Sequence, residues 1–176
     1  MLEVKNIEVV NIERAVDISQ ILVSFDIKTN LNFCEDWQIE EKNIIMSQST
    51  MHAMEKFMNS DFDPYTKYVL PEIKEIAKKN YKAWVKAKKT EDKQKIYETF
   101  ETLVHNLPRG FELWATVNSN FLQLKTMVIQ RAHHKNQEDW GAFVEFCYSL
   151  PKFRELCGLD NSEWDLSKLF PLYKSI

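Results

Sequence analysis

The amino-acid sequence predicts an α+β protein in which a small amino-terminal β-sheet packs on a mainly helical body. Two observations predict this class: apolar and polar residues alternate with period two before Asn43, and apolar residues recur at helical spacing after it. A chain of 176 residues, of which 44% are hydrophobic, has enough apolar side chains for one core. We therefore expect a single domain over 1–176 that is sheet-rich over 1–37, helical over 45–158 and irregular over the tail 159–176.

Two segments near the amino terminus have the pattern of β-strands. Residues 2–10 alternate loosely, and residues 21–29 alternate cleanly between apolar and polar side chains. β-Branched and aromatic residues, which suit the surface of a sheet, are frequent in both. Between them, residues 13–20 predict a short helix or a turn, and residues 31–37 are a third extended candidate.

Six segments after Asn43 carry the apolar periodicity of helices. Pro71 suits the first residue of a helix, because proline lacks the N–H that would be unsatisfied there. Thr90, followed by Glu91 and Asp92, has the pattern of an N-cap with acidic residues in the first turn. The predicted helices cover 47–59, 71–88, 90–104, 111–130, 137–149 and 151–158.

Composition and motifs exclude several functional classes. With only 3 Gly, the chain contains no dinucleotide-binding G-x-G-x-x-G, no P-loop and no G-x-S-x-G. The three cysteines, Cys34, Cys147 and Cys157, are odd in number and show no C-x-x-C spacing, so we expect reduced, buried thiols. Adjacent His133 and His134 would diverge on a helix, so no metal site is expected.

The chain also lacks the marks of export or membrane insertion. Its first twenty residues have no basic region followed by an apolar one, and no apolar run approaches the ~20 residues that a membrane span requires. We expect a soluble, cytoplasmic protein that does not associate with a membrane.

A lysine-rich stretch runs from Lys74 to Lys95 and holds nine lysines. A basic helix of this kind can follow a nucleic-acid backbone, and Tyr81 and Trp84 lie within the stretch. However, these two aromatic residues fall on the predicted apolar face and the lysines on the opposite one, which is the ordinary pattern of a solvated helix. We therefore do not expect nucleic acid as a partner.

Two polar segments are candidates for a binding site. The first is Ser47-Gln48-Ser49-Thr50-Met51-His52, at a predicted helix start where unpaired amides favour anions. An N-cap alone would also explain it, since Ser and Thr are preferred there. The second is the polar face of the predicted helix 111–130, which could instead face water or another subunit. Its polar residues are Asn118, Asn120, Gln123, Lys125, Thr126 and, just beyond it, Arg131.

Read together, these segments resemble the flavin-dependent thymidylate synthase family, particularly its small phage-type members. The family signature is R-H-R-x-x-S-x-N-x-x-S-x-R shortly after a Trp, and Trp37 and Ser49 stand at the positions of that Trp and of the second signature Ser. The family also has a later helix with the pattern N-x-R-x-L-x-[HN]-F-L-x-L-R, which the segment from Asn120 to Arg131 resembles. The family pattern A-Q-x-E follows that helix, and Gln137 and Asp139 stand at the distance of its Gln and Glu. The similarity spans most of residues 20–150.

The sequence departs from the signature at its basic positions. Ile39-Glu40-Glu41 stands in place of R-H-R, Met51 in place of the final Arg, and Leu122 in place of the Arg of the later helix. At an effective dielectric constant near 20, a like charge ~4 Å from a phosphate disfavours binding by about 4 kcal/mol. The usual phosphate clamp is therefore missing from this chain.

The resemblance implies an α+β fold, a homotetramer with pockets shared between subunits, and a site for deoxyuridine monophosphate and FAD. It implies that Ser47, Gln48, Ser49, His52 and Arg131 bind the substrate, and that Asn120, Thr126, Gln137 and Asp139 bind the cofactor. An active enzyme would methylate the pyrimidine, using NADPH and methylenetetrahydrofolate. No catalytic residue is assigned.

Two alternatives to an enzyme remain open at this stage. The loss of the arginines also fits a catalytically degenerate homologue, encoded by a phage, that binds a nucleotide or another small molecule or blocks a host protein. The other alternative is a small nucleic-acid-binding protein that uses the face from Lys74 to Lys95.

Overall fold

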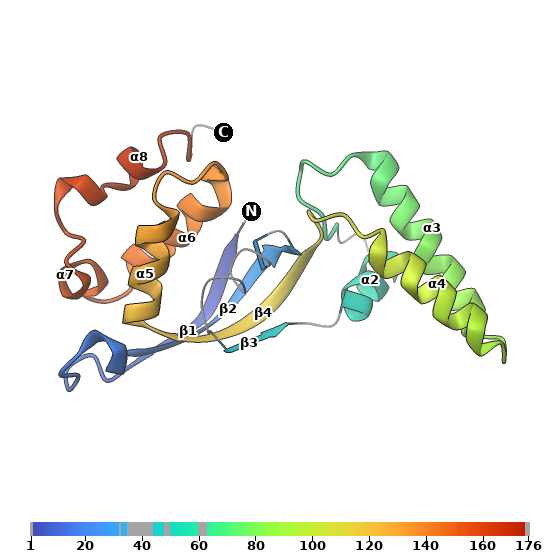
Figure 1. Cartoon of the computed structure of the whole chain (residues 1–176), viewed down its shortest axis with the longest axis horizontal. Helices are drawn as coiled ribbons and strands as arrows, with labels where there is room; N and C mark the ends of the chain where they lie inside the picture. Colours follow the sequence, from blue (N-terminus) through green and yellow to red (C-terminus); the bar gives the residue numbers. More distant parts are fainter. Residues whose placement is uncertain (1, 32, 35–43, 48–49, 60–62, 175–176) are drawn as a thin grey trace. The chain divides into compact units, whose positions relative to one another are not determined.

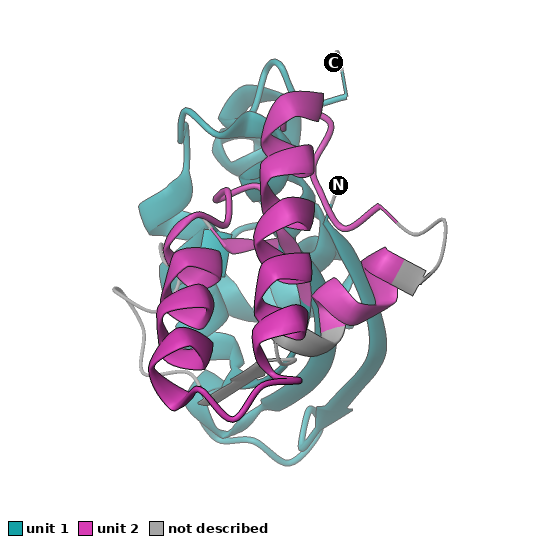
Figure 2. Ribbon diagram, turned by 90° about the vertical axis from the view of Figure 1, so that its right-hand side faces the viewer, with its two compact units in different colours: residues 1–29, 33–47, 114–176 teal, residues 30–32, 48–113 magenta. Residues whose placement is uncertain are grey.

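The computed structural model describes residues 2–31, 33–34, 44–47, 50–59 and 63–174. The chain divides into two compact units (Figure 2): unit 1 comprises residues 1–29, 33–47 and 114–176, and unit 2 comprises residues 30–32 and 48–113. Strands and helices both contribute, which confirms the α+β class. None of the described helices is both long enough and apolar enough to cross a bilayer.

A four-stranded sheet has the strand order β1-β2-β4-β3 (Figure 1). Its strands are β1 (Glu3–Val10), β2 (Leu22–Asn30), β3 (Ile44–Ser47) and β4 (Glu112–Asn120). The pairs β1–β2 and β3–β4 are antiparallel. Two backbone hydrogen bonds show that β2 and β4 also run antiparallel. The Phe121 N–H, after the end of β4, donates to the Ile21 carbonyl, before the start of β2, at 3.0 Å. The Leu31 N–H, after the end of β2, donates to the Phe111 carbonyl, before the start of β4, at 3.1 Å.

In unit 1, helices cover one face of the sheet and form the larger core (Figure 1). Val23, Phe25 and Ile27 of β2 alternate onto this face and are buried, as the period-two pattern predicts. They belong to one apolar cluster with Trp140 and Phe143. The helices of this unit are α5 (Phe121–Arg131), α6 (Gln137–Ser149), α7 (Phe153–Cys157) and α8 (Leu166–Leu169), with short 3-10 turns at Ile18–Gln20 and Ser162–Trp164.

Unit 2 contains α2 (Thr50–Asn59), α3 (Pro71–Ala87) and α4 (Lys93–His105). Pro71 is the first residue of α3, as expected. The predicted cap at Thr90 is wrong: Asp92 caps α4 by accepting a hydrogen bond from the Lys95 N–H at 3.0 Å, and Thr90 bonds back to the Ala87 carbonyl. An aspartate carboxylate directly before the helix reaches the third helical N–H better than a residue two positions earlier.

The prediction of one helix over 111–130 is wrong in its first half. Residues Glu112–Asn120 form β4, and the helix α5 begins only at Phe121. Phe111, Trp114, Val117 and Phe121 fit helical spacing, but burial along β4 alternates with period two. Pairing with β2 and β3 satisfies the backbone of a segment that is rich in weak helix formers, so tertiary contacts override the helical spacing.

Two further boundaries differ from the prediction. Ser47 ends β3, and α2 begins at Thr50 rather than at Ser47. The tail after 159 is also more ordered than predicted, because α8 lies in it and Leu169 and Phe170 are buried in the core of unit 1. Short elements of this kind are stabilised by packing and leave little periodicity in the sequence.

The carboxyl-terminal segment packs closely on α6 at Gly141. The Tyr173 hydroxyl donates a hydrogen bond to Glu145 at 2.7 Å, and Lys174 pairs with the same carboxylate. A Cβ at position 141 would lie 2.6 Å from Cγ of Tyr173 and 2.9 Å from its Cβ. Glycine is required here because the ring occupies the space of a side chain.

We expect Gly141→Ala to lower the free energy of unfolding by up to about 2 kcal/mol, since overpacking costs about 1–3 kcal/mol and the gain in helix propensity is near 1 kcal/mol. Urea denaturation followed by circular dichroism measures this change. With Tyr173→Gly as the background both the ring and the Cβ at position 173 are removed, so the same Gly141→Ala change should then stabilise the chain. A destabilisation of equal size in both backgrounds would contradict this account.

Candidate functional site

The junction between β4 and α5 is built around a capping box. The Asn120 side-chain oxygen accepts a hydrogen bond from the Gln123 N–H at 2.9 Å, and Gln123 Oε1 accepts one from the Asn120 N–H at 3.2 Å. The Ser119 hydroxyl donates to the same Gln123 oxygen at 3.2 Å. The sequence Asn-x-x-Gln therefore satisfies the first orphan N–H groups of α5 and turns the chain sharply out of the sheet.

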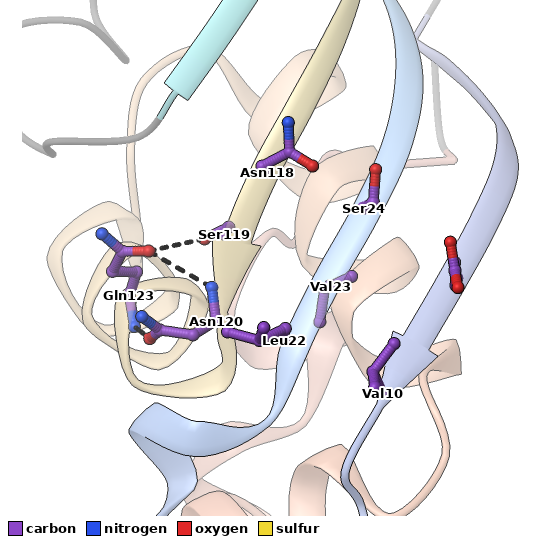
Figure 3. A pocket seen from close by; sticks show the side chains of 9 residues that line it. Val10, Leu22, Val23, Ser24, Asn118, Ser119, Asn120 and Gln123 are labelled. Carbon is purple, nitrogen blue, oxygen red and sulfur yellow. Dashed lines mark hydrogen bonds between the residues drawn. The ribbon is translucent and has the colours of Figure 1, made fainter.

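An open hollow of about 420 Å³ lies beside this junction (Figure 3). Its floor is the face of the sheet that carries the polar residues of β1, β2 and β4. Glu8 pairs with Ser24 in the β1–β2 register, and the antiparallel pairing of β2 with β4 sets Asn118 beside Ser24. Figure 3 shows these two side chains next to each other on adjacent strands. Four elements thus contribute to one hollow in unit 1.

Several polar groups in the hollow have hydrogen-bonding capacity to spare. Among the described residues, no side chain or backbone group bonds to the side chains of Asn118, Ser24 or Glu8. The side-chain oxygens of Asn120 and Gln123 are committed to the capping box, but their NH₂ groups have no acceptor within the described part of the chain. The hollow therefore offers the NH₂ donors of Asn120 and Gln123, and the carboxamide of Asn118, which can both donate and accept. It also offers the hydroxyl of Ser24 and the carboxylate of Glu8.

The charge and apolar surface of the hollow limit what it can bind. Glu8 is the one charged residue that lines it in the described structure, and no Lys or Arg does. Leu22 and Val10, which pair across β1 and β2, are 50% and 42% exposed and give it an apolar wall. A flat, uncharged ring with polar edges suits this combination, and a phosphate does not.

The predicted substrate residue Arg131 does not line this hollow. It lies in the last turn of α5, where its guanidinium stacks over the buried ring of Trp140 at 4.5 Å. Eleven residues separate it from Asn120, which corresponds to about 16 Å along a helix. The two residues therefore lie at opposite ends of α5.

The other predicted cofactor residues of unit 1 hold local structure. Thr126 donates to the Leu122 carbonyl at 2.9 Å, one turn back on α5. Gln137 donates to the His134 carbonyl and accepts from the Leu172 N–H, and so ties the carboxyl-terminal segment to α6. Asp139 accepts from the side chain of Asn136, the N-cap of α6. Only Asn120 of this group lines the hollow.

The first predicted segment is only partly within the described structure. The backbone of Ser47 ends β3 and that of His52 lies in α2, but their side chains are outside the described part. Gln48, Ser49 and Trp37 lie outside the described residues altogether. The roles assigned to these residues stay predictions.

The cysteines are not candidates for a nucleophile. Cys147 and Cys157 are buried, and burial raises the pKa of Cys157 to about 11 and that of Cys147 well above its usual value. Cys34 is half-buried. Among the residues that the structure describes, no three His, Cys, Asp or Glu side chains gather as a metal site would require.

Sequence analysis missed Glu8 and Ser24 as site residues and placed the candidate Asn118 on a helix rather than on a strand. They lie far apart in the chain and reach one hollow only because β1, β2 and β4 are neighbours. The available signal was the alternation of polar side chains on the strands, which would have put Ser24 on the polar face of 21–29. For Asn118 that signal was hidden by the incorrect helix over 111–130.

Comparison with known proteins adds no assignment. No family model matches the chain, and no curated protein matches it.

Asn120→Ala should lower the free energy of unfolding by about 1 kcal/mol, because the capping box loses its acceptor. Asn120→Asp keeps the acceptor and should stay within a few tenths of a kcal/mol of the original chain. Thermal and urea denaturation measure both. Equal losses for the two variants would show that the cap is not the source of the effect.

The same sheet face carries an acid–base feature next to the hollow. Thr116 Oγ1 and Asn6 Nδ2 each donate a hydrogen bond to the Asp26 carboxylate at 2.6 Å. The hydrogen bond from Thr116, and then the one from Asn6, hold the pKa of Asp26 below its ordinary value of 3.8. A lowered carboxyl pKa stabilises the fold above pH ~4, and this contribution is lost as pH falls through the folded-state pKa.

Thr116→Val should therefore raise the pKa of Asp26 toward its ordinary value. Titration of the Asp26 carboxyl carbon by NMR measures the change, and Asp26→Asn identifies the resonance. Thr126→Val, which removes a hydroxyl on α5, serves as the control and should leave the titration unchanged. An unchanged Asp26 pKa in Thr116→Val would refute the hydrogen-bond explanation.

Proposed function

We propose that this chain is a pyrimidine-nucleotide-binding protein of the flavin-dependent thymidylate synthase type that has lost methyl transfer. The observation that carries the proposal is the convergence of Asn118, Ser24 and the capping-box amides on one open hollow. This hollow adjoins the segment from Asn120 to Arg131, which is part of the resemblance to that family.

The chemistry of the hollow suits the base of the nucleotide. The edge of uracil presents an N–H between two carbonyl oxygens. The carboxamide of Asn118 has an acceptor and a donor side by side and can pair with such an edge through two hydrogen bonds. Leu22 and Val10 supply apolar surface for a face of the ring. Because Glu8 repels phosphate, the sugar and phosphate would extend toward solvent.

Three observations support binding without methyl transfer. Leu122 replaces the arginine that the family has in its later helix. Arg131 stacks on Trp140 at the far end of α5 from the hollow. Thr126, Gln137 and Asp139 make hydrogen bonds that hold local structure. These features favour a protein that binds the nucleotide without FAD, which would have to supply the hydride chemistry.

Isothermal titration with deoxyuridine, deoxyuridine monophosphate and deoxycytidine tests the proposal. We expect the first two to bind with similar affinity, because none of the described residues that line the hollow is a cation that could contact the phosphate. Asn118→Leu should weaken deoxyuridine binding at least about tenfold, the equivalent of one or two lost hydrogen bonds. Asn80→Leu, on α3 in unit 2, is the control and should bind normally. Absence of binding by either uridine ligand would refute the proposal.

The absorption spectrum of freshly purified protein separates this proposal from the enzyme. We expect no flavin band in the near-ultraviolet and blue, and no release of the C5 hydrogen of deoxyuridine monophosphate when FAD, NADPH and methylenetetrahydrofolate are added. A flavin band with turnover that is lost in Arg131→Ala would establish the methyltransferase instead. Native mass measurement in the same experiment tests the homotetramer that the resemblance implies.

A further inference from the structure

A second hollow, of about 300 Å³, lies in unit 2 along α3. It is lined by Lys82, Lys86 and Lys89 together with apolar atoms of Met58, Tyr81 and Val85. We call these six residues the lysine groove. Met58 comes from α2, so the groove runs where α2 meets α3.

The three lysines share one side of α3 and its end. Their spacing of four and three residues places them on the same face, over about 10 Å along the axis. All three are exposed. Between Ile76 and Thr90 the sequence has six lysines and no acidic residue. The groove is therefore a row of positive charge along a shallow depression.

Two carboxylates of unit 2 pair with lysines outside this row. Lys74 pairs with Asp63 at 2.6 Å, and Lys78 pairs with Glu75 at 2.9 Å. Within the described residues, Lys82, Lys86 and Lys89 form no ion pair. Burial, and then the charge of Glu55, raise the pKa of Tyr81, so among the described residues Glu55 is an acidic side chain near the groove.

The three lysines lie at the border of the apolar face rather than opposite it. Sequence analysis set the lysines opposite the apolar face of 71–88, whereas the folded chain brings three of them to the border of that face, beside Val85 and the buried Tyr81. Lysines four residues apart repel each other by a few tenths of a kcal/mol in a helix without a counter-charge. An anionic ligand would remove this repulsion.

We propose that the lysine groove binds the phosphate backbone of a nucleic-acid strand without reading its bases. Lysine ammonium groups act as mobile point charges for phosphate and release counterions when they bind it. The row is long enough to contact successive phosphates, and the groove is open rather than enclosed. Tyr81 is its one aromatic residue and is 8% exposed, so no ring is available for base stacking.

Fluorescence anisotropy with labelled single-stranded and double-stranded oligonucleotides of mixed sequence tests the proposal. We expect binding at low salt that weakens with added salt, with a slope of log K against log[salt] of about −2 for a single strand contacted by three lysines. Oligonucleotides of different sequence and equal length should bind equally. No binding to either form at low salt would overturn the proposal.

The variant Lys82→Gln/Lys86→Gln/Lys89→Gln should weaken binding at least about tenfold and reduce the salt slope by about 2. The control Lys93→Gln/Lys135→Gln/Lys168→Gln changes the net charge equally, from −3 to −6, at exposed lysines outside the groove. It should bind much more tightly than the groove variant. Equal losses would assign binding to overall charge and overturn the site.

Two more measurements identify the ligand. Lys82→Arg/Lys86→Arg/Lys89→Arg keeps the charge and should retain binding, while circular dichroism confirms that each variant is folded. Inorganic triphosphate should compete with the oligonucleotide only weakly, because it is shorter than the lysine row. Competition by triphosphate at concentrations equal to those of the oligonucleotide would assign the groove to small polyphosphates instead.

Discussion

Antiparallel pairing of β2 with β4 is the interaction on which the rest of unit 1 depends. The two strands are some ninety residues apart in the chain, and hydrogen bonds hold their register at Ile21 with Phe121 and at Asp26 with Thr116. This pairing converts residues Glu112–Asn120 into a strand and fixes where α5 begins. One strand pair therefore determines both the core face and the polar face of the sheet.

The two faces of that pair divide structure from binding. On one face, Phe25 and Val117 join the aromatic cluster around Trp140, where large rings contribute much of the buried apolar area. On the other face, the side chains of Ser24 and Asn118 meet in the open hollow at the end of the sheet. Strand alternation makes this division unavoidable, because a buried residue is followed by one that points the opposite way.

Charge is distributed differently in the two units, and this shapes what each can bind. The hollow of unit 1 carries one carboxylate and several uncharged polar groups, which suit a heterocyclic base. Among the described residues that line it, the lysine groove of unit 2 has three ammonium groups and no carboxylate, which suits phosphates. The overall charge of −3 hides this contrast, so net charge alone misleads about both surfaces.

The sequence by itself determined the α+β class, the strand over 21–29 and the helices that begin at Pro71 and Gln137, because local periodicity and capping residues act over a few positions. Tertiary structure decided the identity of 112–120, whose apolar spacing fits a helix and a strand about equally well. It also decided the site: Thr126 and Gln137 were read as ligand-binding residues, yet their hydrogen bonds hold local structure, whereas Asn120 both caps α5 and lines the hollow. Alternation could place Ser24 on a polar face, but only long-range strand pairing brings Glu8 and Ser24 to Asn118.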